Sequence, residues 1–125
     1  MVGEDLLARL REKNPRYTDA AYVFLLSSLQ HTIEHLDEPR HISGRELAEG
    51  CRDFAIEQYG PMARTVLEHW GVHSTEDMGD VVYALIDCGV LIRQECDSRQ
   101  DFENVFDFEE AFERNYPWGK LEPRS

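Results

Sequence analysis

The segment HTIEH, residues 31 to 35, contains the residue types of a zinc-peptidase signature in the order H-x-x-E-H. In enzymes that use such a signature, the two histidines bind one zinc ion and the glutamate acts as the general base. The site also needs a third ligand from another element, an open coordination position and a cleft that limits access of solvent. His31, Glu34 and His35 are therefore the candidate metal ligands of this chain.

The helix predicted to carry this segment turns these three side chains away from the core. Between residues 18 and 36, apolar residues recur at helical spacing, at Tyr22, Leu25, Leu26, Leu29, Ile33 and Leu36. Relative to Leu29, the three side chains lie between about 140° and 240° around the helix. We interpret them as a polar helix face with an adventitious histidine pair, and we expect no cofactor. The alternative is a histidine-dependent metal-binding protein, because two imidazoles on one face capture nickel or zinc weakly.

The net charge of the chain limits its partners. The 125 residues include 13 Lys and Arg against 25 Asp and Glu, so the formal net charge is −12. That sign repels phosphate backbones and anionic membranes, so neither nucleic acid nor a membrane is an expected partner. The length fits one domain, residues 1–125. Cys51, Cys88 and Cys96 form no C-x-x-C pair, which is typical of reduced thiols and predicts a cytoplasmic location.

Caps and helix breakers predict the order of the helices. Residues 1–36 are expected to form a pair of N-terminal helices. Ser43 and Glu46 have the spacing of a capping box, so another helix is expected to begin there. Glycines are expected to end this helix and the two that follow it, at Gly60, Gly71 and Gly89.

The residues after the last of these glycines predict a small β-hairpin. Residues 90–95 and 102–108 are prone to form strands and flank a polar turn. Three helices followed by a hairpin resemble the winged-helix arrangement over residues 43–108. A C-terminal helix is expected over residues 108–116. The predicted fold class is therefore mainly α with a small β-hairpin, a winged-helix-like core and two extra N-terminal helices.

The helix that would read DNA in such a fold has the wrong charge for that task. Its charged residues are all acidic, at Glu76, Asp77, Asp80 and Asp87. A reading helix needs lysine or arginine nearby to neutralise phosphates. A DNA-binding regulator is therefore the weaker alternative. The sequence also lacks a glycine-rich phosphate loop and a G-x-S-x-G elbow, so catalysis is not expected.

One family resemblance covers about residues 16 to 112. The run HISGRELAEGCRDFAIEQYGPMARTVLEHWGVHSTEDMGDVVYALIDCGVL, together with RYTDAAYVFLLSSL and DSRQDFENVFDF, resembles the Minf-type domain, an uncharacterised bacterial family. The resemblance implies a shared fold and a bacterial cytosolic setting. It implies no activity, substrate or catalytic residue.

A candidate surface site comes from polar and amphipathic residues that lie beside predicted core positions, namely Arg45, Arg64, Glu68, His69 and Trp70. A concave cluster of these side chains would form a binding site. The sequence thus predicts an acidic, noncatalytic protein-interaction or assembly module. Its expected partner is another protein, and a homodimer is one form that the assembly would take.

Overall fold

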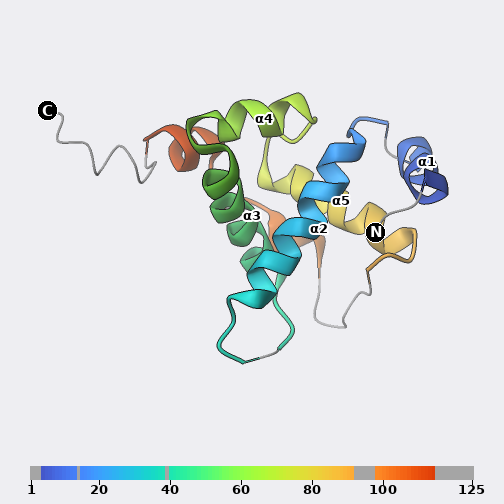
Figure 1. Cartoon of the computed structure of the whole chain (residues 1–125), viewed down its shortest axis with the longest axis horizontal. Helices are drawn as coiled ribbons and strands as arrows, with labels where there is room; N and C mark the ends of the chain where they lie inside the picture. The colour runs from blue at the N-terminus through green and yellow to red at the C-terminus, as the bar shows by residue number, and fades with distance from the viewer. Residues whose placement is uncertain (1–3, 14, 39, 92–97, 115–125) are drawn as a thin grey trace, which may run out of the picture.

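The computed structural model describes residues 4–13, 15–38, 40–91 and 98–114 and, within them, the side chains of residues 6 to 112. This part of the chain is mainly helical, as predicted (Figure 1). Its α-helices are α1 (Glu4–Lys13), α2 (Asp19–Glu34), α3 (Gly44–Tyr59), α4 (Ala63–His69) and α5 (Thr75–Asp87). Shorter turns are the 3-10 segments η1 (Gly60–Met62) and η2 (Arg99–Phe102) and the π-helical η3 (Glu110–Arg114). None of the described helices has the length and apolar character needed to cross a membrane.

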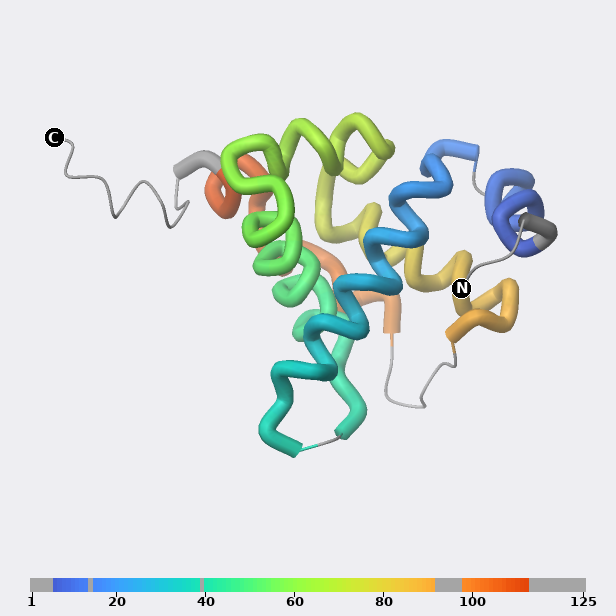
Figure 2. The backbone as a smooth tube through the Cα atoms, viewed as in Figure 1, coloured from blue at the N-terminus to red at the C-terminus, as the bar shows by residue number. Residues whose placement is uncertain are grey.

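Helices α2 and α3 form a hairpin whose connection lies at one end of the molecule (Figure 2). Helix α5 packs against α2, while η2 contacts both α3 and α5. The hairpin is tight at Gly50, where an added Cβ would overlap the side-chain oxygen of Thr32. That hydroxyl donates to the carbonyl of Ser28 at 2.8 Å, so it is held in place by its own helix. A glycine at position 50 therefore permits the close approach of α2 and α3.

The predicted start of α3 is confirmed in atomic detail. The Ser43 hydroxyl accepts from the Glu46 backbone N–H at 3.1 Å, and the Glu46 carboxylate accepts from the Ser43 N–H at 2.9 Å. Two of the N–H groups that a helix start leaves without partners are thereby satisfied. Ile42 and Leu47, on either side of the cap, are both buried. Ser74 caps α5 in a similar way, since its side chain accepts from the Asp77 N–H.

The ion pair beside this cap predicts a pH-dependent contribution to stability. Arg40 donates to the two carboxylate oxygens of Glu46 at 3.0 and 2.7 Å. These bonds, and next the backbone N–H of Ser43, lower the pKa of Glu46 from 4.5 to about 2. Because the folded-state pKa is depressed, the stabilisation is complete above pH 4.5 and is lost as the pH falls through about 2. We expect Arg40→Ala to bring the Glu46 pKa closer to 4.5 in a carboxyl NMR titration.

Denaturant unfolding at several pH values provides the second measurement. The stability difference between the wild type and Arg40→Ala should be present at neutral pH and should shrink in acid. Arg45→Ala is the control, because Arg45 pairs with Glu49 and not with Glu46. A Glu46 pKa that stays near 2 after Arg40→Ala would contradict the prediction.

The predicted β-hairpin and winged helix are not confirmed. No strand occurs in the described ranges, and residues 92–95 of the first expected strand lie outside them. Residues 102–108, expected as the second strand, instead continue from η2 through a turn into a helix that begins at Phe108. The backbone N–H groups of Asn104 and Val105 donate to the side chains of Glu76 and Thr75, at 3.1 and 3.3 Å. These donors are therefore used by the first turn of α5 rather than by a neighbouring strand.

A capping box starts this irregular segment. The Ser98 hydroxyl accepts from Gln100 N–H at 3.1 Å, and the Asp101 carboxylate accepts from Ser98 N–H at 3.3 Å. Ser98 through Asp101 therefore turn into η2, where the sequence pattern predicted a polar hairpin loop. Phe102 follows with only 3% of its surface exposed. Its ring approaches both Gly44 of α3 and Gly79 of α5.

Candidate functional site

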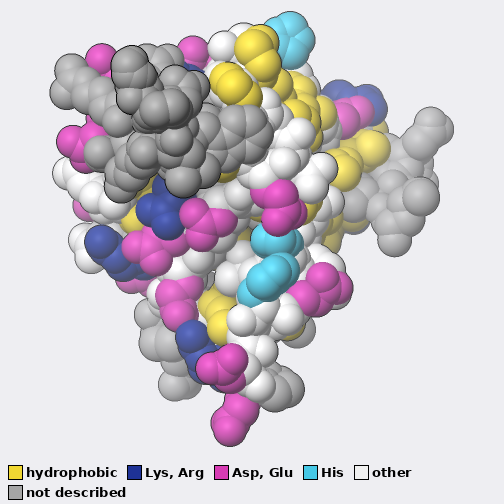
Figure 3. Space-filling view, turned by 60° about the vertical axis from the view of Figure 1, so that its left-hand side comes forward, with side chains coloured by type: hydrophobic (Ala, Val, Ile, Leu, Met, Phe, Trp, Pro, Cys, Tyr) yellow, Lys and Arg dark blue, Asp and Glu magenta, His cyan; other side chains and the backbone are white. Residues whose placement is uncertain are grey.

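The histidine pair lies on the surface of α2 but is less exposed than the sequence predicted. The rings of His31 and His35 have centroids 4.2 Å apart, and the His31 ring also packs 5.0 Å from Phe54 of α3. Nδ1 of His35 lies 2.8 Å from the carbonyl oxygen of His31. Figure 3 shows two histidine side chains against one another on the surface, with acidic side chains nearby. His31 is half-buried, while His35 is exposed.

The difference arises because α2 is rotated about its own axis relative to the predicted apolar stripe. Ser28 is fully buried, and Ile33, which was expected in the buried stripe, is 43% exposed. The buried side of the helix consists of Ala21, Tyr22, Phe24, Leu25 and Ser28. The Ser28 hydroxyl donates to the Phe24 carbonyl at 2.9 Å, which satisfies a polar group inside the core. The helix is therefore rotated relative to the predicted stripe, and His31 moves toward α3.

The surroundings of the pair offer few further metal ligands. Glu34 accepts a hydrogen bond from Gln30 at 2.9 Å on the same helix. Within the described ranges, no group of three or more His, Cys, Asp or Glu side chains is placed to hold a metal ion. A metal ion bound by His31 and His35 would thus have two imidazole ligands from this part of the chain. A peptidase zinc site needs at least one more.

A groove runs along the outer side of α2, next to His31. Its apolar lining comes from α1, α2, α3 and the third residue after α5, with Leu6, Val23, Leu26, Phe54 and Val90. Val23, which lines the groove, is 48% exposed. Apolar side chains that are exposed together in a groove are typical of a binding surface, whereas isolated ones are common on any protein.

The segment from Glu34 to His41 contains three carboxylates and one arginine, Arg40, which is paired with Glu46. Glu34 lies in the lining, and Asp37 and Glu38 follow in the exposed connection to α3. The C-terminal end of α2 adds the negative end of its helix dipole to these carboxylates. The groove therefore combines apolar walls with a negative potential at one end.

The predicted surface cluster of Arg45, Arg64, Glu68, His69 and Trp70 does not form one site. Arg45 lies in the first turn of α3 and pairs with Glu49 at 3.5 Å. Arg64 and Glu68 pair at 2.9 Å on α4, beyond the other end of α3 (Figure 1). The length of α3 between them is roughly 20 Å at 1.5 Å per residue. His69 is exposed on the last turn of α4.

Trp70 has a packing role rather than an exposed one. Its ring lies 5.6 Å from that of Phe24 and 5.7 Å from that of Tyr59. Its carbonyl accepts from the Thr18 N–H at 3.3 Å, so it also fixes the start of α2. The aromatic contacts join α2, the end of α3 and the end of α4.

A buried carboxylate network was missed by sequence reasoning. The Tyr17 hydroxyl lies 3.1 Å from Oδ1 of Asp77 and 3.0 Å from Oδ2 of Asp80. Asp77, only 4% exposed, also accepts from the His73 N–H at 2.8 Å and pairs with Arg16 at 3.0 Å. Burial, and then the two carboxylates, raise the pKa of Tyr17 far above its usual value, so the hydroxyl stays protonated as a donor. The network fixes the segment before α2 to the start of α5.

Comparisons of the chain with models of protein families, with curated proteins and with solved structures gave no match.

Proposed function

We propose that the chain is a noncatalytic interaction module whose α2 groove binds an amphipathic helix of a basic partner protein. The observation that carries the proposal is the exposure of Val23, at 48%, in a groove lined by Leu26 and Phe54. An amphipathic helix that binds in such a groove buries its aliphatic side chains against the apolar lining. Burying one such side chain contributes about 1.5–3 kcal/mol.

Charge favours a basic partner over a second copy of the chain. The formal net charge of −12 makes two copies repel one another. A partner helix with lysine or arginine beside its apolar stripe would instead be attracted to the end of the groove that holds Glu34. Electrostatic attraction of this kind raises the association rate and fixes the orientation of the partner.

A pair of synthetic helices tests this proposal. One is an amphipathic peptide of leucine and lysine, and the other has the same leucine pattern with glutamate in place of lysine. Fluorescence anisotropy should show tighter binding of the leucine–lysine peptide. Val23→Asp should weaken that binding about tenfold, because it places a charge where an aliphatic side chain of the peptide is buried.

The matched control is Met62→Asp, which adds the same charge at a methionine that is 55% exposed and lies outside the groove lining. Nonspecific attraction to an acidic protein would make both variants bind the peptide slightly more tightly. Equal effects of the two substitutions would therefore refute the groove as the binding surface. Sedimentation of the free chain as a dimer that Val23→Asp dissociates would assign the groove to a second copy instead.

Two alternatives make different predictions. A histidine-dependent metal protein, with His31 and His35 as ligands, would retain stoichiometric nickel or zinc in elemental analysis of tag-free protein. A winged-helix DNA-binding regulator would bind duplex DNA with a steep dependence on salt. The proposed setting is the bacterial cytoplasm, and membership of the Minf-type family stays a prediction.

A further inference from the structure

The two histidines beside the α2 groove lie close enough to share one metal ion. His31 lines the groove, and its ring centroid lies 4.2 Å from that of His35, one turn further along α2. Both side chains reach the surface, since His31 is half-buried and His35 is exposed. Zinc–nitrogen bonds of about 2.0–2.1 Å place two imidazole nitrogens about 3.3 Å apart in a tetrahedral site. Two rings as close as these can therefore bind one ion between them.

The hydrogen bond of His35 determines which of its ring nitrogens is available. Nδ1 lies 2.8 Å from the backbone carbonyl oxygen of His31, and because a carbonyl oxygen only accepts, Nδ1 carries the proton. Nε2 of His35 therefore has the free lone pair that a metal ion needs. Histidines that bind metals commonly donate their other N–H to a backbone carbonyl or a carboxylate, which orients the ring. The His31 ring is held from its other side by Phe54, 5.0 Å away.

Carboxylates lie near the pair on α2 and in the connection to α3. Glu34 lines the same groove as His31, while Asp37 and Glu38 line a pocket together with His35. Figure 3 shows acidic side chains beside the two histidines. The C-terminal end of α2, where the pair lies, adds the negative end of the helix dipole. The potential at the pair therefore favours a cation.

Two arginines of the neighbouring segments are bound to carboxylates of their own. Arg52 of α3 pairs with Asp53 at 3.0 Å, and Arg40 of the connection pairs with Glu46 at 2.7 Å. Within the described part of the chain, no group of three or more His, Cys, Asp or Glu side chains is placed around a metal ion. Water would therefore fill the remaining coordination positions, and the ion would exchange with solvent rather than stay as a resident cofactor.

We propose that His31 and His35 bind one divalent transition metal ion, and that the bound ion weakens docking of a basic helix in the α2 groove. Because His31 belongs to the groove lining, the two positive charges of the ion lie where Glu34 otherwise attracts lysine or arginine. The effect on docking rests on the function proposed above, whereas the metal site does not. Since coupling between two ligands is reciprocal, a bound helix weakens metal binding by the same factor.

Titration of the full chain, without a histidine tag, with zinc tests the metal site. The imidazole signals of His31 and His35 in NMR spectra should shift together and saturate at one zinc ion per chain. His35→Ala should raise the dissociation constant of zinc at least about tenfold, because loss of a partner outside the ligand shell already costs about 10–100-fold. Absence of saturable binding would refute the site.

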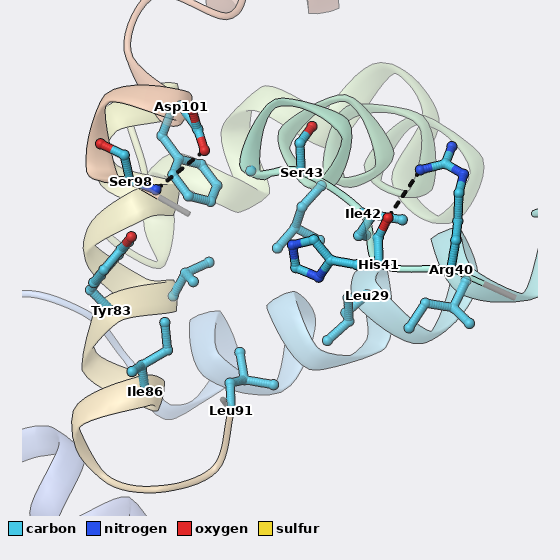
Figure 4. A pocket seen from close by; sticks show the side chains of 15 residues that line it. Leu29, Arg40, His41, Ile42, Ser43, Tyr83, Ile86, Leu91, Ser98 and Asp101 are labelled. Carbon is cyan, nitrogen blue, oxygen red and sulfur yellow. Dashed lines mark hydrogen bonds between the residues drawn. The ribbon is translucent and has the colours of Figure 1, made fainter. Parts of the chain in front are cut away.

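Two other histidines provide control variants. His69 is also four positions from a histidine, but Gly71, with a φ of 97°, lies between the two and follows the end of α4. His41 lines a different cavity, where Arg40 donates to its backbone carbonyl at 3.1 Å (Figure 4). His69→Ala and His41→Ala should therefore keep the zinc affinity of the wild type. A loss in either control as large as that in His35→Ala would contradict the assignment of the ligands.

The leucine–lysine peptide tests the coupling between the metal ion and the groove. Saturating zinc should raise the dissociation constant of the peptide for the wild type about fivefold, and it should have no effect on the peptide affinity of His35→Ala. Zinc that binds without changing the peptide affinity would refute the coupling. If the peptide fails to bind even the metal-free protein, the proposed function of the groove and the coupling both fail, while the zinc titration decides the metal site separately.

Discussion

Phe102→Ala should lower the free energy of unfolding by about 3–5 kcal/mol, the usual cost of removing a buried phenylalanine side chain. An added Cβ at Gly44 would lie 2.8 Å from the Phe102 ring, and one at Gly79 would lie 3.0 Å from it. The ring thus occupies space that two helices leave open by having glycine at those positions. Its removal would leave a void between α3 and α5 that helix backbones fill poorly. Chemical denaturation followed by circular dichroism measures the loss.

The control for this substitution is Phe106→Ala. Phe106 is half-buried and lies beside Phe108 and Arg52, with its ring centroid 5.8 and 5.7 Å away from them. Its truncation opens a site that water reaches, so the expected loss is smaller, about 1–2 kcal/mol. A loss at Phe102 no larger than that at Phe106 would mean that η2 does not join α3 to α5. Free energies of unfolding are typically about 5–15 kcal/mol, so Phe102→Ala would remove a large part of the stability of the fold.

Asp77→Ala should cost about 3 kcal/mol, the second largest effect. The substitution removes the acceptor for the backbone N–H of His73 and the carboxylate that pairs with Arg16. Tyr17 keeps its bond to Asp80, so one part of the network survives. Hydrogen bonds to a charged group contribute about 1.5–3 kcal/mol, and the Asp77 carboxylate that accepts them is only 4% exposed. Arg16, with 55% of its side chain exposed, is rehydrated and adds little to the loss.

The matched control is Asp19→Ala, the same substitution in an ion pair on the surface. Arg11 donates to both oxygens of Asp19 at 2.8 Å, but the Asp19 side chain is 38% exposed. Surface pairs of this kind contribute about 0–1 kcal/mol. Thermal and denaturant unfolding of the two variants should therefore differ clearly. Similar small losses in both would show that the buried network does not stabilise the fold.

Local sequence signals predicted the helices well because each signal acts within a few residues. The Ser43 and Glu46 capping box appears where the spacing placed it. Gly71 and Gly89 follow α4 and α5 with φ of 97° and 82°, in the left-handed region that ends helices. The second strand of the predicted hairpin is not observed, because its β-prone residues were equally compatible with a turn that buries Phe102. The turn is favoured because Gly44 and Gly79 leave room for the Phe102 ring.

The candidate site was less predictable because it depends on contacts between distant segments. The i, i+4 spacing of His31 and His35 was visible in the sequence, and the rings do meet. The rotation of α2 was not visible, because only the packing of α3 and α5 decides that Ser28 is buried and Ile33 is exposed. The groove depends on the same rotation. The bonds of Tyr17 to Asp77 and Asp80 join residues 60 and 63 positions apart, for which no local pattern exists.

The long span of the Tyr17 bonds has a consequence for the order of folding. Helices α2 and α3 are neighbours in the chain, so their pairing closes only a short loop. The bonds from Tyr17 to α5 instead close a loop of about 60 residues, and the entropy of that closure delays them. They are therefore expected to form after the transition state for folding. The network is therefore expected to slow unfolding and to prolong the lifetime of the native state, while it leaves the folding rate almost unchanged.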